Sequence, residues 1–162
     1  MDICYMKADK IEGECTDEDF KGWQTLMGFQ HGLVNLASGD RSTGGGGSKG
    51  IADHSEIGVT TTFDKGCTDL INACLSGKNL DLVEFAMCRQ TGEKKQRLLT
   101  VKTHNTVVVG FDYSAGSGGE VIVNLRLNYS KIEWDYNVLD NKGASKGNKT
   151  ASWNRETDKA AV

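Results

Sequence analysis

Carboxylates near the N-terminus are the densest group of side chains in this chain that could bind a metal. Six of them fall between residues 9 and 19: Asp9, Glu12, Glu14, Asp17, Glu18 and Asp19. Such a cluster could hold calcium, but an EF-hand loop needs the order D-x-[DN]-x-[DN]-G, which is absent here. We therefore predict a solvated acidic loop and no metal site.

A run of four glycines between residues 44 and 47 is the next candidate, because Ser48 and Lys49 follow it. A glycine-rich loop beside a lysine can cradle a phosphate. The Walker motif, however, places Gly-Lys-Ser/Thr at the start of a helix. Here the order is Gly-Ser-Lys and a strand pattern follows. We predict no nucleotide and no other cofactor, and interpret residues 38–50 as a long flexible connection between strands.

Histidines and cysteines are the remaining candidates for catalysis. His31, His54 and His104 are too scattered to indicate a site, and neither G-x-S-x-G nor His-x-x-x-His occurs. The five cysteines form no C-x-x-C, so neither a disulfide framework nor a zinc site is indicated. The alternative of a catalytic Cys–His pair stays open, since such partners meet only in the folded chain. We predict no catalytic residue and a protein that is not an enzyme.

Composition narrows the class of protein further. The 162 residues suit one domain, and the net charge of −3 argues against a nucleic-acid binder. No apolar run is long enough for a membrane span. The first residues lack the charged and apolar regions of a signal peptide. We expect synthesis in the cytosol, with any export by another route.

The segment that organises the chain is residues 57–77, where a strand pattern changes into a helix pattern. Asp64 is a natural N-cap and Gly77 can adopt the left-handed conformation that ends a helix. The strand has one face made of Ile57, Val59, Thr61 and Phe63, and the helix has one apolar stripe made of Cys67, Leu70, Ile71, Cys74 and Leu75. We expect this helix to cover a sheet built by the rest of the chain.

A long strand is predicted over residues 23–34. Its bulky face carries Trp23, Met27, Phe29 and Leu33, and its small, mostly polar face carries Gln24, Gly28, Gln30 and Gly32. The small face could meet solvent, line a ligand cavity or form a channel wall, and the residues alone leave these three alternatives open.

The remaining strands are predicted from alternation and turn residues. Residues 80–89 are apolar on both faces, residues 90–93 suit a hairpin turn, and two further strands cover residues 96–102 and 105–113. Alternation over residues 121–129 changes parity after Ser130, which predicts a one-residue bulge in one long, bent strand. Residues 140–150 are predicted as a polar loop, with Trp153 anchoring the tail. The residues alone predict a β-barrel or sandwich with one helix.

Short motifs follow one another in a fixed order along the chain: Lys10-Ile11-Glu12-Gly13-Glu14, Gly28-Phe29-Gln30-His31-Gly32, the glycine run, Ile57-Gly58-Val59-Thr60-Thr61-Thr62-Phe63-Asp64-Lys65, Ala73-Cys74-Leu75-Ser76-Gly77-Lys78, Ser117-Gly118-Gly119, Leu127-Asn128-Tyr129-Ser130-Lys131-Ile132 and Ser152-Trp153-Asn154. Through these motifs, taken end to end, the chain resembles the haemolysin-coregulated protein (Hcp) family of bacterial type VI secretion systems. One departure is that Cys67-Thr68 stands where the family has Ser-Pro at the start of the helix.

The resemblance implies an antiparallel β-barrel of two packed sheets capped by one helix, as a single domain over residues 1–162. Within it, residues 139–162 would be a polar extension that docks through Trp153. Six copies would form a ring, and rings would stack into the inner tube that leaves the bacterium. That would explain secretion from the cytoplasm without a signal peptide.

The implied partners are other copies of the chain, the type VI spike and sheath or baseplate proteins, and effector proteins held in the lumen. Gln24 and Gln30 are the expected lumen contacts. The expected inter-ring loop is Ser42, Thr43, Gly44, Gly45, Gly46, Gly47 and Ser48. A contractile-phage tail-tube protein and a small-ligand-binding barrel are the alternatives.

Overall fold

The computed structural model of this protein describes residues 3–35 and 52–160. Those residues form one helix, α1 (Lys65–Ser76), and ten strands. The strands are β1 (Ile3–Ala8), β2 (Gln24–Gln30), β3 (Leu33–Asn35), β4 (Ala52–His54), β5 (Ile57–Thr62), β6 (Asn79–Thr91), β7 (Lys94–Ala115), β8 (Val121–Asn128), β9 (Lys131–Leu139) and β10 (Ser145–Asn154).

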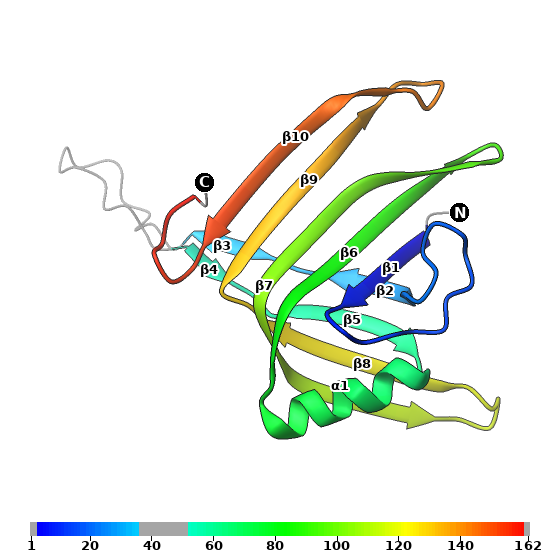
Figure 1. Ribbon diagram of the computed structural model, residues 1–162, viewed down its shortest axis with the longest axis vertical. Coiled ribbons are helices and arrows are strands. Elements are labelled where there is room, and N and C mark those ends of the chain that lie inside the picture. The colour runs from blue at the N-terminus through cyan, green and yellow to red at the C-terminus, as the bar shows by residue number, and fades with distance from the viewer. Residues whose placement is uncertain (1–2, 36–51, 161–162) are drawn as a thin grey trace, which may run out of the picture.

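Six antiparallel strands close into a barrel in the order β7-β6-β1-β2-β5-β8, and pairing of β8 with β7 completes it. The 22-residue β7 makes this closure possible, because its first part pairs with β6 and β9 and its last part with β8. Beyond the barrel, β9 and β10 continue the sheet as an open flap, while β3 and β4 form a separate two-stranded ribbon (Figure 1). The predicted class, an antiparallel barrel with one helix, is confirmed.

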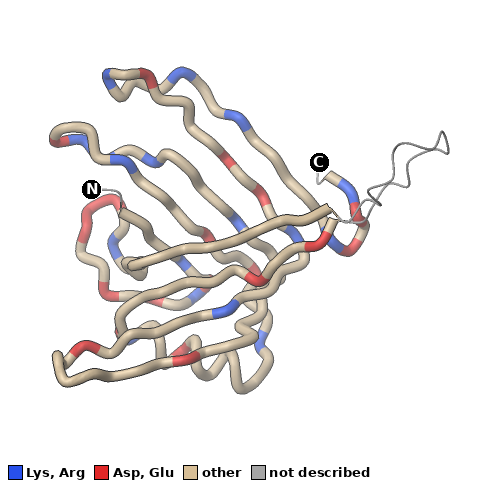
Figure 2. The backbone as a smooth tube through the Cα atoms, turned by 180° about the vertical axis from the view of Figure 1, so that it is seen from behind, with Lys and Arg blue, Asp and Glu red and all other residues tan. Residues whose placement is uncertain are grey.

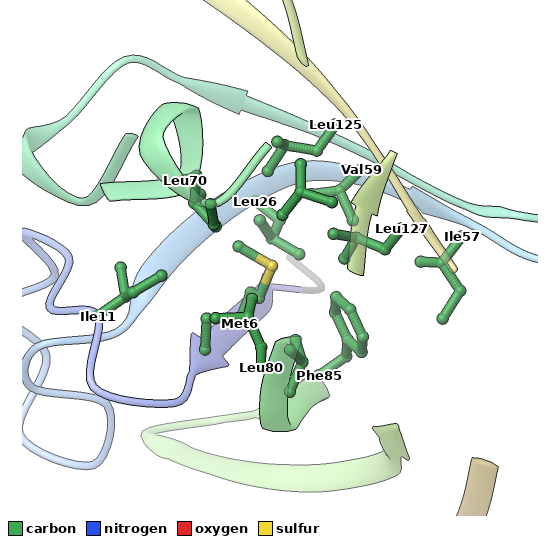
Figure 3. Close-up of a cluster of buried hydrophobic side chains, with 14 of the residues drawn as sticks. Met6, Ile11, Leu26, Ile57, Val59, Leu70, Leu80, Phe85, Leu125 and Leu127 are labelled. Carbon is green, nitrogen blue, oxygen red and sulfur yellow. The ribbon is translucent and has the colours of Figure 1, made fainter. Parts of the chain in front are cut away.

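The barrel interior is filled with side chains. Figure 3 shows Met6 from β1, Leu26 from β2 and Phe85 from β6 converging with Leu70 from α1. Each large apolar side chain buried in this way stabilises the fold by roughly 1.5–3 kcal/mol. Because side chains fill the interior, contacts with other molecules fall on the outside of the barrel and on the elements that project from it.

Helix α1 begins and ends where the sequence predicts. Asp64 Oδ1 accepts a hydrogen bond from the Cys67 N–H at 3.2 Å, and Cys67 Sγ accepts one from the Asp64 N–H at 3.5 Å. Gly77 adopts φ of 65° at the other end. Within the described ranges, no helix has the length and apolar character needed to cross a bilayer.

The buried stripe of α1 is narrower than predicted. Leu70 is only 1% exposed, but Leu75 is 81% exposed, and Ala73 is buried instead. Successive helical residues are rotated by about 100°, so the side chain of Leu75 lies well round the helix from that of Leu70. The prediction that Leu75 packs on the sheet is therefore wrong.

The predicted strand over residues 23–34 is two strands with a change of parity. The pairing of β2 with β5 shifts register between Leu26 and Gly28. Leu26 is consequently buried while Met27 is 62% exposed, and Phe29 turns inward, with its ring 4.9 Å from that of Phe85. The chain then leaves the barrel to form β3.

The predicted bulge after Ser130 is also wrong. Strands β8 and β9 both pair with β7, with Asn128 opposite Val107 and Lys131 opposite His104. Two residues lie between these pairs on each side, 129–130 and 105–106, so no extra residue is inserted relative to β7. The chain bends instead at a two-residue break between β8 and β9. The two strands predicted over residues 96–113 are likewise one continuous strand, β7.

The predicted polar loop over residues 140–150 is mostly strand. Asp140 Oδ1 accepts hydrogen bonds from the N–H groups of Lys142 and Ala144, both at 2.8 Å, which shapes a short turn. The chain then returns as β10, paired with β9. Trp153 at its end is partly buried against the core. An edge strand with exposed side chains lacks the apolar alternation from which strands are predicted.

Candidate functional site

The outward wall formed by β2, β5 and β8 is the part of the barrel best suited to meet another molecule. These three strands contain a single charged residue, Arg126. Figure 2 views the molecule from the side opposite to that of Figure 1, and there the nearly uncharged wall contrasts with the mixed charges of the flap. A groove of about 370 Å³ crosses it, lined by Gly28, Phe29, Gln30, Gly58, Val59, Thr60, Asn124, Leu125 and Arg126.

Glycines form the floor of this groove. A Cβ added to Gly58 would lie 2.9 Å from Cγ of Gln30, so the Gln30 side chain lies directly over the backbone of β5. Arg126 lies in the same way over Gly110 of β7, where an added Cβ would come within 2.4 Å of its guanidinium. Only glycine at these two positions lets long polar side chains lie flat along the wall.

The polar groups of the groove are paired weakly. Thr60 Oγ1 donates a hydrogen bond to Asn124 Oδ1 at 2.9 Å. The Arg126 guanidinium lies 3.7 Å from the Glu56 carboxylate, and both side chains are about half exposed. A pair so open to solvent contributes little to stability. Arg126 can therefore exchange Glu56 for a carboxylate or a main-chain carbonyl of a bound polypeptide.

Of the two predicted lumen residues, only Gln30 lies in this groove. Gln24 is 3% exposed, and its Nε2 donates a hydrogen bond to Asp64 Oδ1 at 2.8 Å, beside the start of α1. The prediction that Gln24 contacts the lumen is wrong. The register shift in β2 is the reason, because it puts Gln24 and Gln30 on opposite sides of the barrel wall.

Three further members of this site, Thr60, Asn124 and Arg126, are not predicted from the sequence. The alternation of residues 121–129 contains the relevant signal, since Asn124 and Arg126 are its polar members. What it lacks is the pairing of β5 with β8, which places Thr60 opposite Asn124. The predicted inter-ring loop, residues 42–48, lies outside the described residues.

Two of the histidines judged too scattered to form a site are brought together by the fold. His31 Nε2 and His54 Nδ1 both lie 2.7 Å from the hydroxyl of Tyr129. His104 is elsewhere, with Nε2 2.7 Å from the carboxylate of Glu133. Across residues 3–35 and 52–160, no three His, Cys, Asp or Glu side chains are grouped closely enough to hold a metal ion.

Comparisons with known proteins agree on one family. Residues 5–136 match the family model for "Type VI secretion system effector, Hcp". The protein Hcp1 of Pseudomonas aeruginosa is 30% identical over 94 residues, which span 57% of this chain and 57% of that relative.

Solved structures match more of the chain. A type six secretion system protein superposes with a TM-score of 0.92 at 27% identity, over 99% of this chain and all of the other. Hcp1 from Salmonella typhimurium gives 0.79 at 17% identity, over 99% of both chains. A type VI effector from Yersinia pestis gives 0.75 at 20% identity, over 93% of this chain and 98% of the other. The last two, below 25% identity, show the fold alone. The family match over most of its length shows that this chain belongs to the Hcp family of type VI secretion system proteins.

Proposed function

We propose that this protein is the ring-forming subunit of a type VI secretion tube. Six copies close into a ring through one repeated head-to-tail contact, which leaves no free interface once the ring is complete. Rings stack into a tube that leaves the cell, so the protein is exported as part of that tube. The observation that carries the proposal is the agreement of fold and family over nearly the whole chain.

Exposed apolar side chains on the ribbon and on the flap support the assembly of several copies. Leu33 and Val34 of β3 are both more than half exposed. Tyr136 of the flap strand β9 is 44% exposed. Apolar side chains that stay exposed on projecting elements suit surfaces that another protein covers. In the proposed ring, neighbouring copies cover them.

The groove on β2, β5 and β8 is the proposed lumen surface. Its hydroxyl, amide and guanidinium groups suit a water-filled channel that holds a polypeptide by replaceable hydrogen bonds. Effector proteins are therefore the proposed cargo, and spike and sheath or baseplate proteins are the other partners. This role is mechanical and needs no catalytic group or cofactor. The packed interior in Figure 3 disfavours the alternative of a barrel that holds a small ligand inside.

Native mass spectrometry tests the ring. A hexamer has a mass of about 106 kDa, six times the 17.6 kDa of one chain. Because a closed ring satisfies every copy, we expect that species to dominate at micromolar concentration, without a ladder of larger open assemblies. A folded protein that stays monomeric under these conditions contradicts the proposal.

Stacking is assigned to residues 42–48, so a variant shortened over residues 43–48 tests it separately. We expect this variant to keep the ring mass and to lose both tubes in electron micrographs and protein in the culture medium. Loss of the ring would instead assign the segment to the contact between subunits. Tubes and secretion at the parental level would remove the stacking role.

Gln30→Glu tests the lumen surface. The substitution adds one carboxylate per copy to the groove, and in a ring six carboxylates face one channel. We expect an unchanged ring mass and a severalfold decrease in the amount of co-purified acidic effector, because six carboxylates lining one channel repel a cargo of like charge. Gln90→Glu, on the exposed end of β6, is the matched control and should leave cargo unchanged. If Gln30→Glu breaks the ring, Gln30 belongs to a subunit contact.

A further inference from the structure

Two histidines far apart in sequence share one buried hydroxyl at the base of the β3–β4 ribbon. His31 lies between β2 and β3, His54 ends β4, and Tyr129 directly follows β8. Tyr129 is 4% exposed, and its hydroxyl lies 2.7 Å from His31 Nε2 and 2.7 Å from His54 Nδ1. The Tyr129 hydroxyl thus contacts both the segment that leads into β3 and the end of β4.

The hydrogen-bonding capacity of these groups suits two neutral histidines. A neutral imidazole carries one N–H and one bare nitrogen, and a phenol hydroxyl donates one hydrogen bond and accepts others. The hydroxyl can donate to the bare nitrogen of one ring and accept from the N–H of the other. The hydroxyl and the two ring nitrogens that face it then all have partners.

The ribbon itself begins at these histidines. The Ser55 N–H donates a hydrogen bond to the Gly32 carbonyl at 2.9 Å, and the Gly32 N–H donates to Ser55 Oγ at 2.8 Å. Leu33 of β3 pairs with His54 of β4 immediately beyond. The His–Tyr–His contacts therefore lie where the ribbon joins the barrel, and losing them lets the pairing of β3 with β4 open from that end.

A permanently positive group lies against the same tyrosine. The guanidinium of Arg155 is 5.2 Å from the centre of the Tyr129 ring, and its Nη1 donates to the Tyr129 carbonyl at 3.0 Å. Figure 1 shows this C-terminal segment beside the base of the ribbon. The trio therefore has a fixed cation next to it before either histidine is charged.

Other charged groups act on the histidines from the neighbouring segments. Burial, then the charges of His54 and Arg155, hold the pKa of His31 below 6.5. Burial and Arg155 lower the pKa of His54 from 6.5 as well, and the carboxylates of Asp53 and Asp158 oppose them only in part. Both rings are therefore neutral at neutral pH.

We propose that His31, His54 and Tyr129 form a proton-operated latch, which fixes the base of the β3–β4 ribbon to the barrel at neutral pH and releases it on acidification. One proton is tolerated, because a single imidazolium still donates to the hydroxyl. A second proton makes both rings donors, so the hydroxyl hydrogen loses its acceptor. The second proton also leaves two positively charged rings, with centroids 6.4 Å apart, beside Arg155.

The direction of the pH effect follows from the lowered pKa values. The released histidines take up protons at higher pH than the latched ones do, so acid favours release. The latch is fully effective above about pH 6.5, the ordinary histidine value. It weakens as the pH falls below that value and is lost once the pH has passed the lowered pKa values of the latched rings.

Hydrogen exchange of the whole protein tests the latch. After correction for the intrinsic pH dependence of exchange, protection of the Ser55 amide and of the β3–β4 amides should fall at least about tenfold from about pH 7.5 to about pH 5. Amides of β6 should stay protected at both pH values. Ribbon protection that is unchanged over this range overturns the proposal.

Matched variants separate protonation from simple loss of contact. In the double variant His31→Gln with His54→Asn, the amide groups reach the positions of Nε2 and Nδ1 but do not titrate. It should retain ribbon protection at about pH 5. His104→Gln removes the histidine that bonds Glu133 and should respond to pH like the parent. A double variant that loses protection like the parent contradicts the latch.

Tyr129→Phe removes only the shared hydroxyl. It should lose ribbon protection already at about pH 7.5, with little further change in acid. Parental protection in this variant at both pH values would show that the hydroxyl does not hold the ribbon, and would overturn the latch.

Release of the latch should also weaken tubes, a consequence that rests on the proposed function. Its test is separate from the hydrogen-exchange test of the latch. If rings stack, tubes of the parent should come apart at about pH 5 and tubes of the double variant should persist, as seen by electron microscopy. Absence of tubes at every pH, combined with the expected exchange behaviour, counts against stacking and leaves the latch supported. Tubes that persist in acid although the ribbon loses protection contradict the consequence for stacking alone.

Discussion

Leu70→Asp is expected to leave the protein unfolded or insoluble. Leu70 is 1% exposed and points from α1 into the interior among Met6, Leu26 and other apolar side chains (Figure 3). Removing a buried leucine costs about 3–5 kcal/mol, and burying a carboxylate without a partner adds to that loss. The total is comparable with the whole free energy of unfolding of an ordinary domain, about 5–15 kcal/mol. Circular dichroism and the soluble fraction measure the result.

Leu75→Asp is the matched control for that experiment. It makes the same chemical change five residues further along the same helix, where the side chain is 81% exposed. We expect its melting temperature to stay close to that of the parent, because an exposed substitution changes stability by about 0.5 kcal/mol or less. Equal stability of both variants would mean that α1 does not pack through Leu70.

Gly13→Ala is expected to lower the free energy of unfolding by about 2–3 kcal/mol, with a fall in melting temperature of roughly 5–10 °C. A Cβ at this position would lie 2.4 Å from the Trp23 carbonyl oxygen and 2.6 Å from Cγ of Gln24. The first of these atoms is backbone, so the strand must move. Gln24 moves with it, although its amide supports Asp64 at the start of α1.

Gly28→Ala is the matched control for Gly13→Ala. It adds the same methyl group within β2, where the nearest atom to a new Cβ is Thr60 Cβ at 3.8 Å, an ordinary contact. Chemical denaturation should therefore place Gly28→Ala near the parent and Gly13→Ala well below it. Parental stability in Gly13→Ala would mean that the close approach of Gly13 to Trp23 is absent in solution.

The amino-acid sequence by itself determined the features that depend on neighbouring residues. The ends of α1 follow from the cap at Asp64 and the left-handed Gly77, both of which act within one helical turn. The β6–β7 hairpin follows from its turn residues: Thr91 pairs with Lys94, and Gly92 adopts φ of 64°. Motif order along the chain also identified the family before any strand was paired.

Only the tertiary structure decided which side of each strand is buried. Alternation places Gln24 and Gln30 on one face, yet the register shift against β5 buries the first and exposes the second. The cause is a partner strand about 35 residues away, so no local pattern contains it. β10 was missed for a related reason, because pairing with β9 makes it a strand, although its side chains are mostly polar.

The two candidate sites likewise exist only in the folded chain. The groove needs β5 to lie between β2 and β8, since Gln30, Thr60 and Arg126 come from three strands. The latch needs the pairing of β3 with β4, which brings His54 next to His31, and the break after β8, which supplies Tyr129. The physical reason is common to both. Local interactions determine where helices and turns begin and end, whereas strand pairing depends on contacts between segments far apart in sequence, and those form only when the barrel closes.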